Sequence, residues 1–289
     1  MGAVGAAPCT AATVRARLLV QRAWEARGDG FAPQVAPERL AAFRQGLSEA
    51  HRVARRVAGA DPRDLGPWAV LVTTARGPRL PQQEFRELWA EVPARAPRHV
   101  GGRWQAMQYW CAEWHGNDVL MLRFAVRAVE EAPAGSPLPG LHLQALTELE
   151  ARHGTGGLPA GRRYRELLPR AAAALDAVPE SNDRIPTLRH LLAHFALLSR
   201  RPALALEQFR LIGPWCGAHP WSSAPNPVRA FDRARALAAT RAPAAAADRK
   251  AAGNGRSPGG GRSPGGGRSP GGGRSPGGGK GTRVGKAPG

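Results

Sequence analysis

The chain has 289 residues, enough to bury a sizeable core, and a formal net charge of +19. Arginines interrupt every apolar run before it reaches the roughly 18 residues needed to cross a bilayer. Three cysteines cannot form a disulfide framework, which suits a reducing compartment. We therefore expect a cytoplasmic protein with no membrane segment.

The positive charge is unevenly distributed. From Arg249 onward nine residues are basic and none is acidic, so this tail carries about half of the net charge. All three lysines, Lys250, Lys280 and Lys286, fall in the tail, while the rest of the chain uses arginine alone. Together with the abundant alanine, glycine and proline, this usage indicates a GC-rich genome. Mutational bias explains the basic body better than a nucleic-acid surface does, because acidic residues are spread through every segment.

Residues 1–10 are small and apolar without periodicity, and we expect them to be disordered. A first helix is predicted over 11–27, with Val14, Leu18 and Trp24 facing inward. A second helix should begin at Pro37, which suits a first-turn position. Apolar residues then recur at three and four positions as far as Val57.

After residue 66 the helices are predicted to come in pairs. The pairs begin near residues 66, 101, 138 and 185, and prolines and glycines separate their helices. One helix should end near Pro93 and Pro97, and Pro169 should kink or break another, because proline lacks an amide donor. Convincing strand patterns are missing throughout.

Gly101–Pro133 is the pair on which the rest of the prediction depends. We interpret it as two antiparallel helices joined at Gly116-Asn117. Trp104, Met107, Cys111 and Trp114 recur at helical spacing in its first half, and a second apolar stripe follows the turn. A helix that is apolar on more than one side needs covering on more than one side, which is typical of stacked repeats.

The spacing of the pairs resembles the tetratricopeptide repeat family over about 66–213. Trp68-x-x-Leu71 and Trp104-x-x-Met107 are similar to its first-helix signature, and Ala205-x-x-x-Phe209 matches its second. Val72, Gln108 and Leu192 replace its packing glycine, so this resemblance implies looser stacking. The phrases YWCAEWHG and ALEQFRLIGPW also resemble a group of actinobacterial helical proteins with no assigned activity.

Three pairs of residues have metal-ligand spacing. They are His190 with His194, Cys111 with His115, and Cys216 with His219. The usual Cys-x-x-Cys pairs are absent from the sequence, and Cys111 lies on the predicted packing face. We therefore assign no metal ligand, no cofactor and no catalytic residue, and we expect the protein not to be an enzyme.

Two tryptophans, Trp215 and Trp221, lie in the irregular segment 213–227. Such a loop either closes the end of the helical stack or offers a surface to a partner protein, and closure is the favoured alternative. Both residues therefore stay candidates for partner binding.

The tail repeats RSPGGG four times, starting at Arg256, Arg262, Arg268 and Arg274. Glycine and proline at this density cannot bury a core, so disorder is expected from 241 to 289. These arginines are candidates for weak, non-specific phosphate contacts to nucleic acid. Expansion of a short DNA repeat without a role explains the tail equally well.

The sequence thus predicts an all-α body over 11–240, built of antiparallel hairpins stacked as an irregular tetratricopeptide-like solenoid, followed by the disordered tail. The expected role is a non-catalytic scaffold or adaptor that binds another protein. The alternative is a nucleic-acid-associated protein that uses its basic tail.

Overall fold

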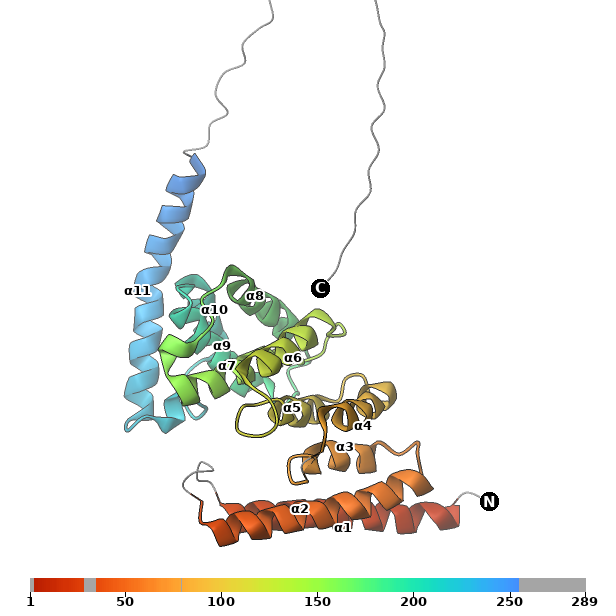
Figure 1. Cartoon of the computed structure of the whole chain (residues 1–289). Helices are drawn as coiled ribbons and strands as arrows, with labels where there is room; N and C mark the ends of the chain where they lie inside the picture. Colours follow the sequence, from red (N-terminus) through yellow and green to blue (C-terminus); the bar gives the residue numbers. More distant parts are fainter. Residues whose placement is uncertain (1–2, 29–34, 79, 255–289) are drawn as a thin grey trace, which may run out of the picture. The chain divides into compact units, whose positions relative to one another are not determined.

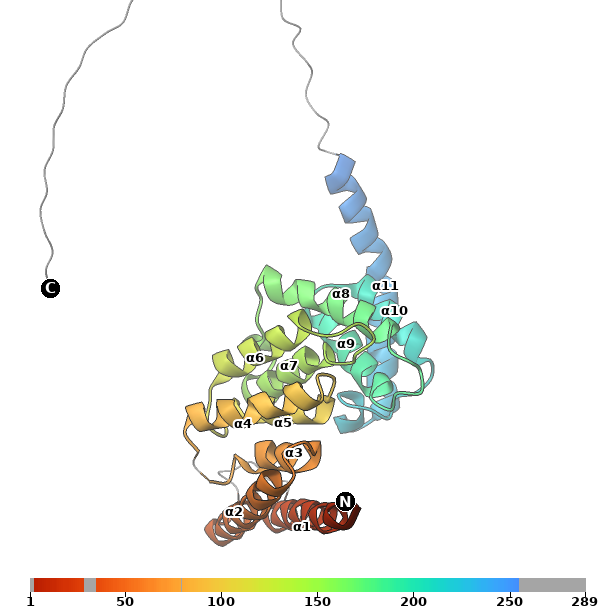
Figure 2. The ribbon, with the colours of Figure 1, turned by 90° about the vertical axis from the view of Figure 1, so that its right-hand side faces the viewer.

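The computed structural model describes residues 3–28, 35–78 and 80–254. This part of the chain contains eleven α-helices and no strand (Figure 1 and Figure 2), so the predicted all-α class is confirmed. Residues 1–249 form one compact unit. The arrangement of the helices as a solenoid stays a prediction, as does the resemblance to tetratricopeptide repeats.

Helices α1 (Ala3–Arg27) and α2 (Pro37–Ala60) lie side by side in both views. Small residues bring their axes together, because a Cβ atom on Gly46 would lie 2.9 Å from the Cβ of Ala23. Val14 and Leu18 are about half exposed, so their predicted inward orientation is wrong. The buried face of α1 instead follows Thr13, Ala16, Val20, Ala23 and Arg27, at spacings of three and four.

The predicted limits of the helical body are too narrow at both ends. Helix α1 begins at Ala3, so residues 3–10, expected to be disordered, are helical. Helix α11 (Pro227–Asn254) continues past residue 240, where the disordered tail was expected to start. Both extensions are rich in alanine, the residue with the highest intrinsic helix propensity.

Helices α3 (Leu65–Thr74), α4 (Gln82–Arg95) and α5 (Val100–Tyr109) follow, and α3 contacts α2, α4 and α5. Asp64 caps α3 by accepting a 2.8 Å hydrogen bond from the N–H of Gly66. His99 caps α5, its Nδ1 accepting from the N–H of Gly102 over 3.0 Å. Each cap satisfies a backbone donor that the first helical turn leaves without a partner.

The first half of the predicted 101–133 hairpin is shorter than expected, because α5 ends at Tyr109 and residues 110–117 form a compact loop. The N–H groups of His115 and Gly116 donate back to the carbonyls of Tyr109 and Cys111. A Cβ atom on Gly116 would lie 2.0 Å from the Trp110 carbonyl oxygen. Glycine therefore permits a close approach that closes the loop.

Helix α6 (Asp118–Glu130) starts at the cap residue Asn117 and packs mainly against α7 (Gly140–His153). Helix α8 (Arg162–Asp176) continues through Pro169, so the predicted break there is wrong. Helix α4 ends at Arg95, between Pro93 and Pro97, where its end was predicted. In α8 the buried face on both sides of the proline offsets the cost of the lost hydrogen bond, about 3 kcal/mol.

Helices α9 (Ile185–Leu198) and α10 (Pro202–Ile212) form the predicted fourth pair, with its turn at Arg200-Arg201. Helix α11 begins as predicted, where the side-chain oxygen of Asn226 accepts from the N–H of Arg229 over 2.9 Å. Phe231 and Ala238 of α11 pack on α9 and α10, whereas Val228 and Leu237 of the same helix are exposed, although they continue its apolar pattern in the sequence.

The largest core extends from α3 to α9 and contains two stacked rings. Phe85 and Tyr109 are fully buried, their ring centroids are 3.6 Å apart and their planes are within 6° of parallel. The Tyr109 hydroxyl donates to the carbonyl of Leu80 over 3.0 Å. Trp110 is buried in this core. Four further tryptophans are half buried and pack against its edge: Trp68, Trp89, Trp104 and Trp114.

Candidate functional site

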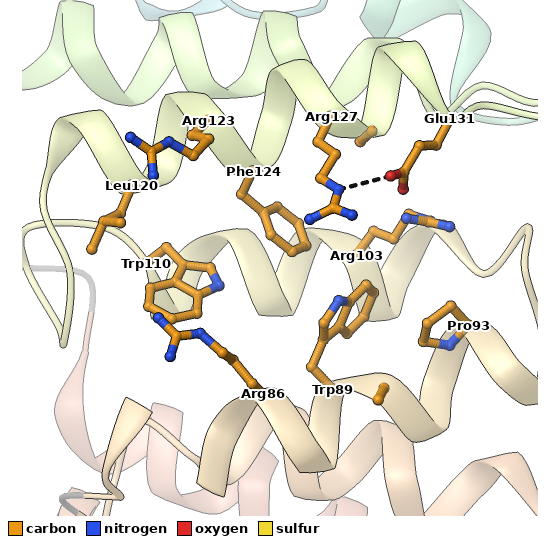
Figure 3. Close-up of a pocket in the computed structure, with 12 residues that line it drawn as sticks. Arg86, Trp89, Pro93, Arg103, Trp110, Leu120, Arg123, Phe124, Arg127 and Glu131 are labelled. Atoms are coloured by element: carbon orange, nitrogen blue, oxygen red, sulfur yellow. Dashed lines mark hydrogen bonds and ion pairs between the residues drawn. The ribbon is translucent and has the colours of Figure 1, made fainter. Parts of the chain in front are cut away.

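A groove of about 460 Å³ lies between α4, α5 and α6 (Figure 3). Its apolar surface comes from Trp89, Trp110 and Phe124, with Leu120, Ala90, Pro93 and Ala128 around them. Helix α5 and the residue that follows it supply the middle, while α4 and α6 supply the two sides. Most of the residues that line the groove therefore belong to helices.

The aromatic rings of the groove are held by packing. Trp89 and Phe124 meet edge to face, with centroids 5.4 Å apart across the gap between α4 and α6. Trp110 is only 7% exposed and meets the buried ring of Phe85 edge to face at 5.5 Å. A ligand would therefore meet a preformed apolar floor at little conformational cost.

Four arginines surround these rings. Arg86 and Arg123 lie at one end of the groove, and Arg103 and Arg127 lie toward the other (Figure 3). The only acidic side chain lining the groove is Glu131, which pairs with Arg127 at 2.7 Å. The lining residues therefore carry a formal charge of +3, and the groove attracts anionic groups.

The arginines differ in how firmly they are held. Within the described residues Arg86 and Arg123 make no hydrogen bond or ion pair, and the Arg86 guanidinium lies 5.5 Å from the Trp110 ring centroid. Arg103 lies 5.7 Å from the Trp89 centroid and donates to the Pro97 carbonyl over 3.1 Å. Burial lowers the pKa of Arg103, because a desolvated cation is less stable than a hydrated one.

Beside the groove, a second hollow of about 390 Å³ extends across α6 toward α8. It shares Arg123, Arg127 and Glu131 with the groove and adds Arg163 from α8. Arg163 pairs with Glu130 over 2.9 Å. Because Glu130 also lines this hollow, the pair adds no net charge, and the excess of arginine is greater in the groove.

The two predicted partner-binding tryptophans have different environments. Trp221 is 6% exposed and packs against Phe209 and Phe231. Trp215 is 75% exposed. Trp221 thus closes the end of the helical body, as the favoured alternative predicted, and only Trp215 offers a free surface.

The metal-spaced pairs are engaged in other contacts. His190 accepts a hydrogen bond from the indole N–H of Trp221 over 3.0 Å, and His194 pairs with Glu150 over 2.8 Å. The Cys111 thiol donates to the Met107 carbonyl over 3.5 Å, and burial raises its pKa to about 12.

In the third metal-spaced pair, Cys216 with His219, the histidine also has another contact. Its Nδ1 lies 3.2 Å from the Ser223 hydroxyl. No group of three or more potential metal ligands occurs among the residues that the structure describes. Arg256, Arg262, Arg268 and Arg274, the predicted phosphate contacts, lie outside the described residues.

The groove was not predicted from the sequence. Phe124 lies in the second half of the predicted 101–133 hairpin, and Arg123 and Arg127 flank it on one side of α6, at spacings of one and three. The pair Arg86 and Trp89 on α4 was a similar signal. Arginine beside aromatic residues on α4 and again on α6 could have indicated a shared surface, but the helix packing was needed to bring them together.

Comparisons with protein-family models, with curated proteins and with solved structures find no match to this chain. In the part of the chain that the structure describes, every helix is too short or too polar to pass through a membrane.

Proposed function

We propose that this protein is a non-catalytic binding protein whose groove between α4, α5 and α6 holds an acidic segment of a partner protein. The observation that supports this is the composition of the groove, in which four arginines surround three aromatic rings and a single carboxylate. Carboxylates of the ligand would reach the guanidinium groups, and its apolar side chains would lie on the rings. Tryptophan and arginine are also the residues most often found to dominate binding energy at protein interfaces.

The arrangement of the rings favours a peptide over single-stranded nucleic acid. Non-specific binding of single strands relies on open aromatic faces on which bases stack. Arg86 lies over the Trp110 ring, Arg103 lies over the Trp89 ring, and the edge contact with Phe124 restricts Trp89 further. These contacts leave the guanidinium edges, which suit carboxylates, more accessible than the ring faces.

The basic tail is not a suitable occupant of this groove. It carries nine basic residues and no acidic one from Arg249 onward, and a groove with a lining charge of +3 would repel it. The ligand we propose is therefore a segment of another protein.

The basic tail supports a second candidate function. Its four evenly spaced arginines, at 256, 262, 268 and 274, could attract nucleic-acid phosphates without sequence preference. Retention of DNA and RNA by the full chain and by residues 1–254, at two salt concentrations, tests this. Loss of salt-sensitive retention with the tail supports the second function, and equal retention contradicts it.

A direct test of the groove uses three labelled probes and fluorescence anisotropy. The first is a short peptide alternating Glu with Leu and Phe, the second has Gln in place of every Glu, and the third is a single-stranded oligothymidine. We expect the acidic peptide to bind at least about tenfold more tightly than the Gln peptide, with an affinity that falls as salt rises. Equal affinity for the two peptides, or tighter binding of the oligothymidine to residues 1–254, would contradict the proposal.

A further inference from the structure

A separate cavity of about 330 Å³ lies where α1, α3, α5 and the 110–117 loop meet, and it shares no lining residue with the groove. Three tryptophans, Trp24, Trp104 and Trp114, form much of its wall. Arg76, which follows α3, also lines it and is only 5% exposed. Gln105, Gln108 and Glu113 complete the lining, so the cavity combines a buried cation, a carboxylate and an aromatic surface.

Two tryptophan rings lie against the Arg76 guanidinium. Its central carbon lies 5.0 Å from the Trp24 ring centroid and 5.3 Å from that of Trp114. The rings themselves meet nearly at right angles, with centroids 6.0 Å apart. Cation–π contacts of this kind stabilise the buried cation and leave the N–H groups at the edges of the guanidinium for hydrogen bonding.

Those edges are partly used. The Nε atom of Arg76 donates to the Thr73 carbonyl over 3.4 Å, and Nη2 donates to the side-chain oxygen of Gln105. Nη1 makes no hydrogen bond within the described part of the chain, and it is not among the fully buried polar atoms that lack a partner. Because Arg76 lines the cavity, Nη1 is the donor that a bound molecule could reach.

The charges around Arg76 leave it without a direct counter-ion. Within the described residues no carboxylate lies within ion-pair distance of it, since Glu113 pairs with the neighbouring Arg27 over 2.8 Å. Arg27 is itself 6% exposed. Glu148, the next acidic residue, accepts a 2.6 Å hydrogen bond from Gln108. Burial lowers the pKa of Arg76 to about 10, so the guanidinium stays charged at neutral pH.

We propose that this cavity binds a small carboxylate with an aromatic body, its two oxygens accepting from Arg76 Nη1 and from the amide of Gln105. The Gln105 oxygen accepts from Arg76 Nη2, and the Gln105 amide nitrogen is a second donor from a residue that lines the cavity. Two such donors suit the two oxygens of one carboxylate. The aromatic body of the ligand would lie against the tryptophans that line the cavity.

The same charges favour a monoanion over a phosphate. A phosphate carries nearly two negative charges at neutral pH, and the nearby carboxylates of Glu113 and Glu148 would repel the second charge. A carboxylate needs one guanidinium and one further donor, and the cavity offers these. An apolar wall also selects against small hydrated anions, which would lose water without gaining contacts.

The test uses benzoate and its neutral isostere benzamide, with binding to the full chain measured by titration calorimetry. We expect benzoate to bind at least about tenfold more tightly than benzamide. The variant Gln105→Leu should weaken benzoate binding by roughly tenfold and leave benzamide binding unchanged. Gln105 is half exposed, so this variant should fold, and circular dichroism checks that it does.

A second variant tests whether the Arg76 guanidinium binds the carboxylate. Arg76→Lys keeps the charge but loses the planar fork, and we expect benzoate affinity to fall by about tenfold or more. The groove variant Arg123→Glu should bind benzoate as the wild type does, which separates this site from the proposed peptide site. Equal binding of benzoate and benzamide, no binding of benzoate, or full binding by folded Gln105→Leu would overturn the proposal.

Discussion

The indole N–H of Trp221 donates to Nδ1 of His190 over 3.0 Å, and both side chains are buried. This contact joins the irregular segment after α10 to the middle of α9. It also fixes the tautomer of His190, because Nδ1 must be the unprotonated nitrogen in order to accept. The sequence allowed two roles for the segment 213–227, closing the helical body or binding a partner. The contact of Trp221 attaches this segment to the core.

Removing this donor should weaken the fold. Trp221→Phe keeps most of the apolar contact but leaves the buried Nδ1 of His190 without a partner, and we expect a loss of about 1–3 kcal/mol in the free energy of unfolding. Urea unfolding monitored by circular dichroism measures it. The matched control is Trp215→Phe, which should change stability by less than about 0.5 kcal/mol because Trp215 is 75% exposed. Equal effects of the two substitutions would contradict the assignment of Trp221 to the core.

Two glycines of α2 should respond in opposite directions to the same substitution. Gly46→Ala places a methyl group 2.9 Å from the Cβ of Ala23, which must push α1 away and should cost roughly 1–3 kcal/mol of stability. Gly59→Ala meets nothing within 4 Å, and should stabilise the helix by up to about 1 kcal/mol. Thermal unfolding of both variants compares them. A Gly46→Ala variant as stable as Gly59→Ala would argue against the close approach of α1 and α2.

His142 should make the protein sensitive to acid. It is fully buried, and neither ring nitrogen makes a hydrogen bond of ordinary geometry in the described part of the chain, although the Tyr164 backbone lies close enough to favour the charged ring slightly. Burial lowers its pKa to about 4, against about 6.5 in the unfolded chain. The unfolded state therefore binds the proton more readily. The contribution of the neutral His142 ring to the free energy of unfolding is complete above about pH 6.5, and it is lost as the pH falls toward 4.

The variant His142→Leu tests this directly. It removes a buried polar ring that lacks good partners and keeps an apolar side chain, so we expect higher stability at pH 7. The difference in unfolding free energy between variant and wild type should grow by roughly 2–4 kcal/mol between pH 6.5 and 4. Urea titrations at several pH values measure it. A difference that stays constant over this range would contradict the lowered pKa.

Much of the fold could be predicted from the sequence because the helices carry strong start and stop signals. Pro37 and the Asn226-Pro227 pair begin helices in the structure, as their residue types predict. The errors came from features that depend on packing. Gly116 closes a loop only because it approaches the Trp110 backbone, and Pro169 is tolerated only because its helix buries apolar residues on both sides.

The groove could not be predicted for a related reason. An arginine beside an aromatic residue on one helix is usually a solvated face next to a packing residue. Arg86 and Arg123 become parts of one site only when α4 and α6 lie on either side of α5. Helix order alone does not fix that arrangement, since α6 packs mainly against α7.

The most direct test of the central claim compares two exposed arginines that make no ion pair or hydrogen bond within the described residues, Arg123 in the groove and Arg170 on α8. Arg123→Glu and Arg170→Glu change the net charge equally, so any non-specific effect of charge on binding is shared. We predict that Arg123→Glu weakens binding of the acidic peptide by at least about tenfold, while Arg170→Glu changes it by less than about twofold. Equal losses in the two folded variants would contradict a peptide site between α4, α5 and α6.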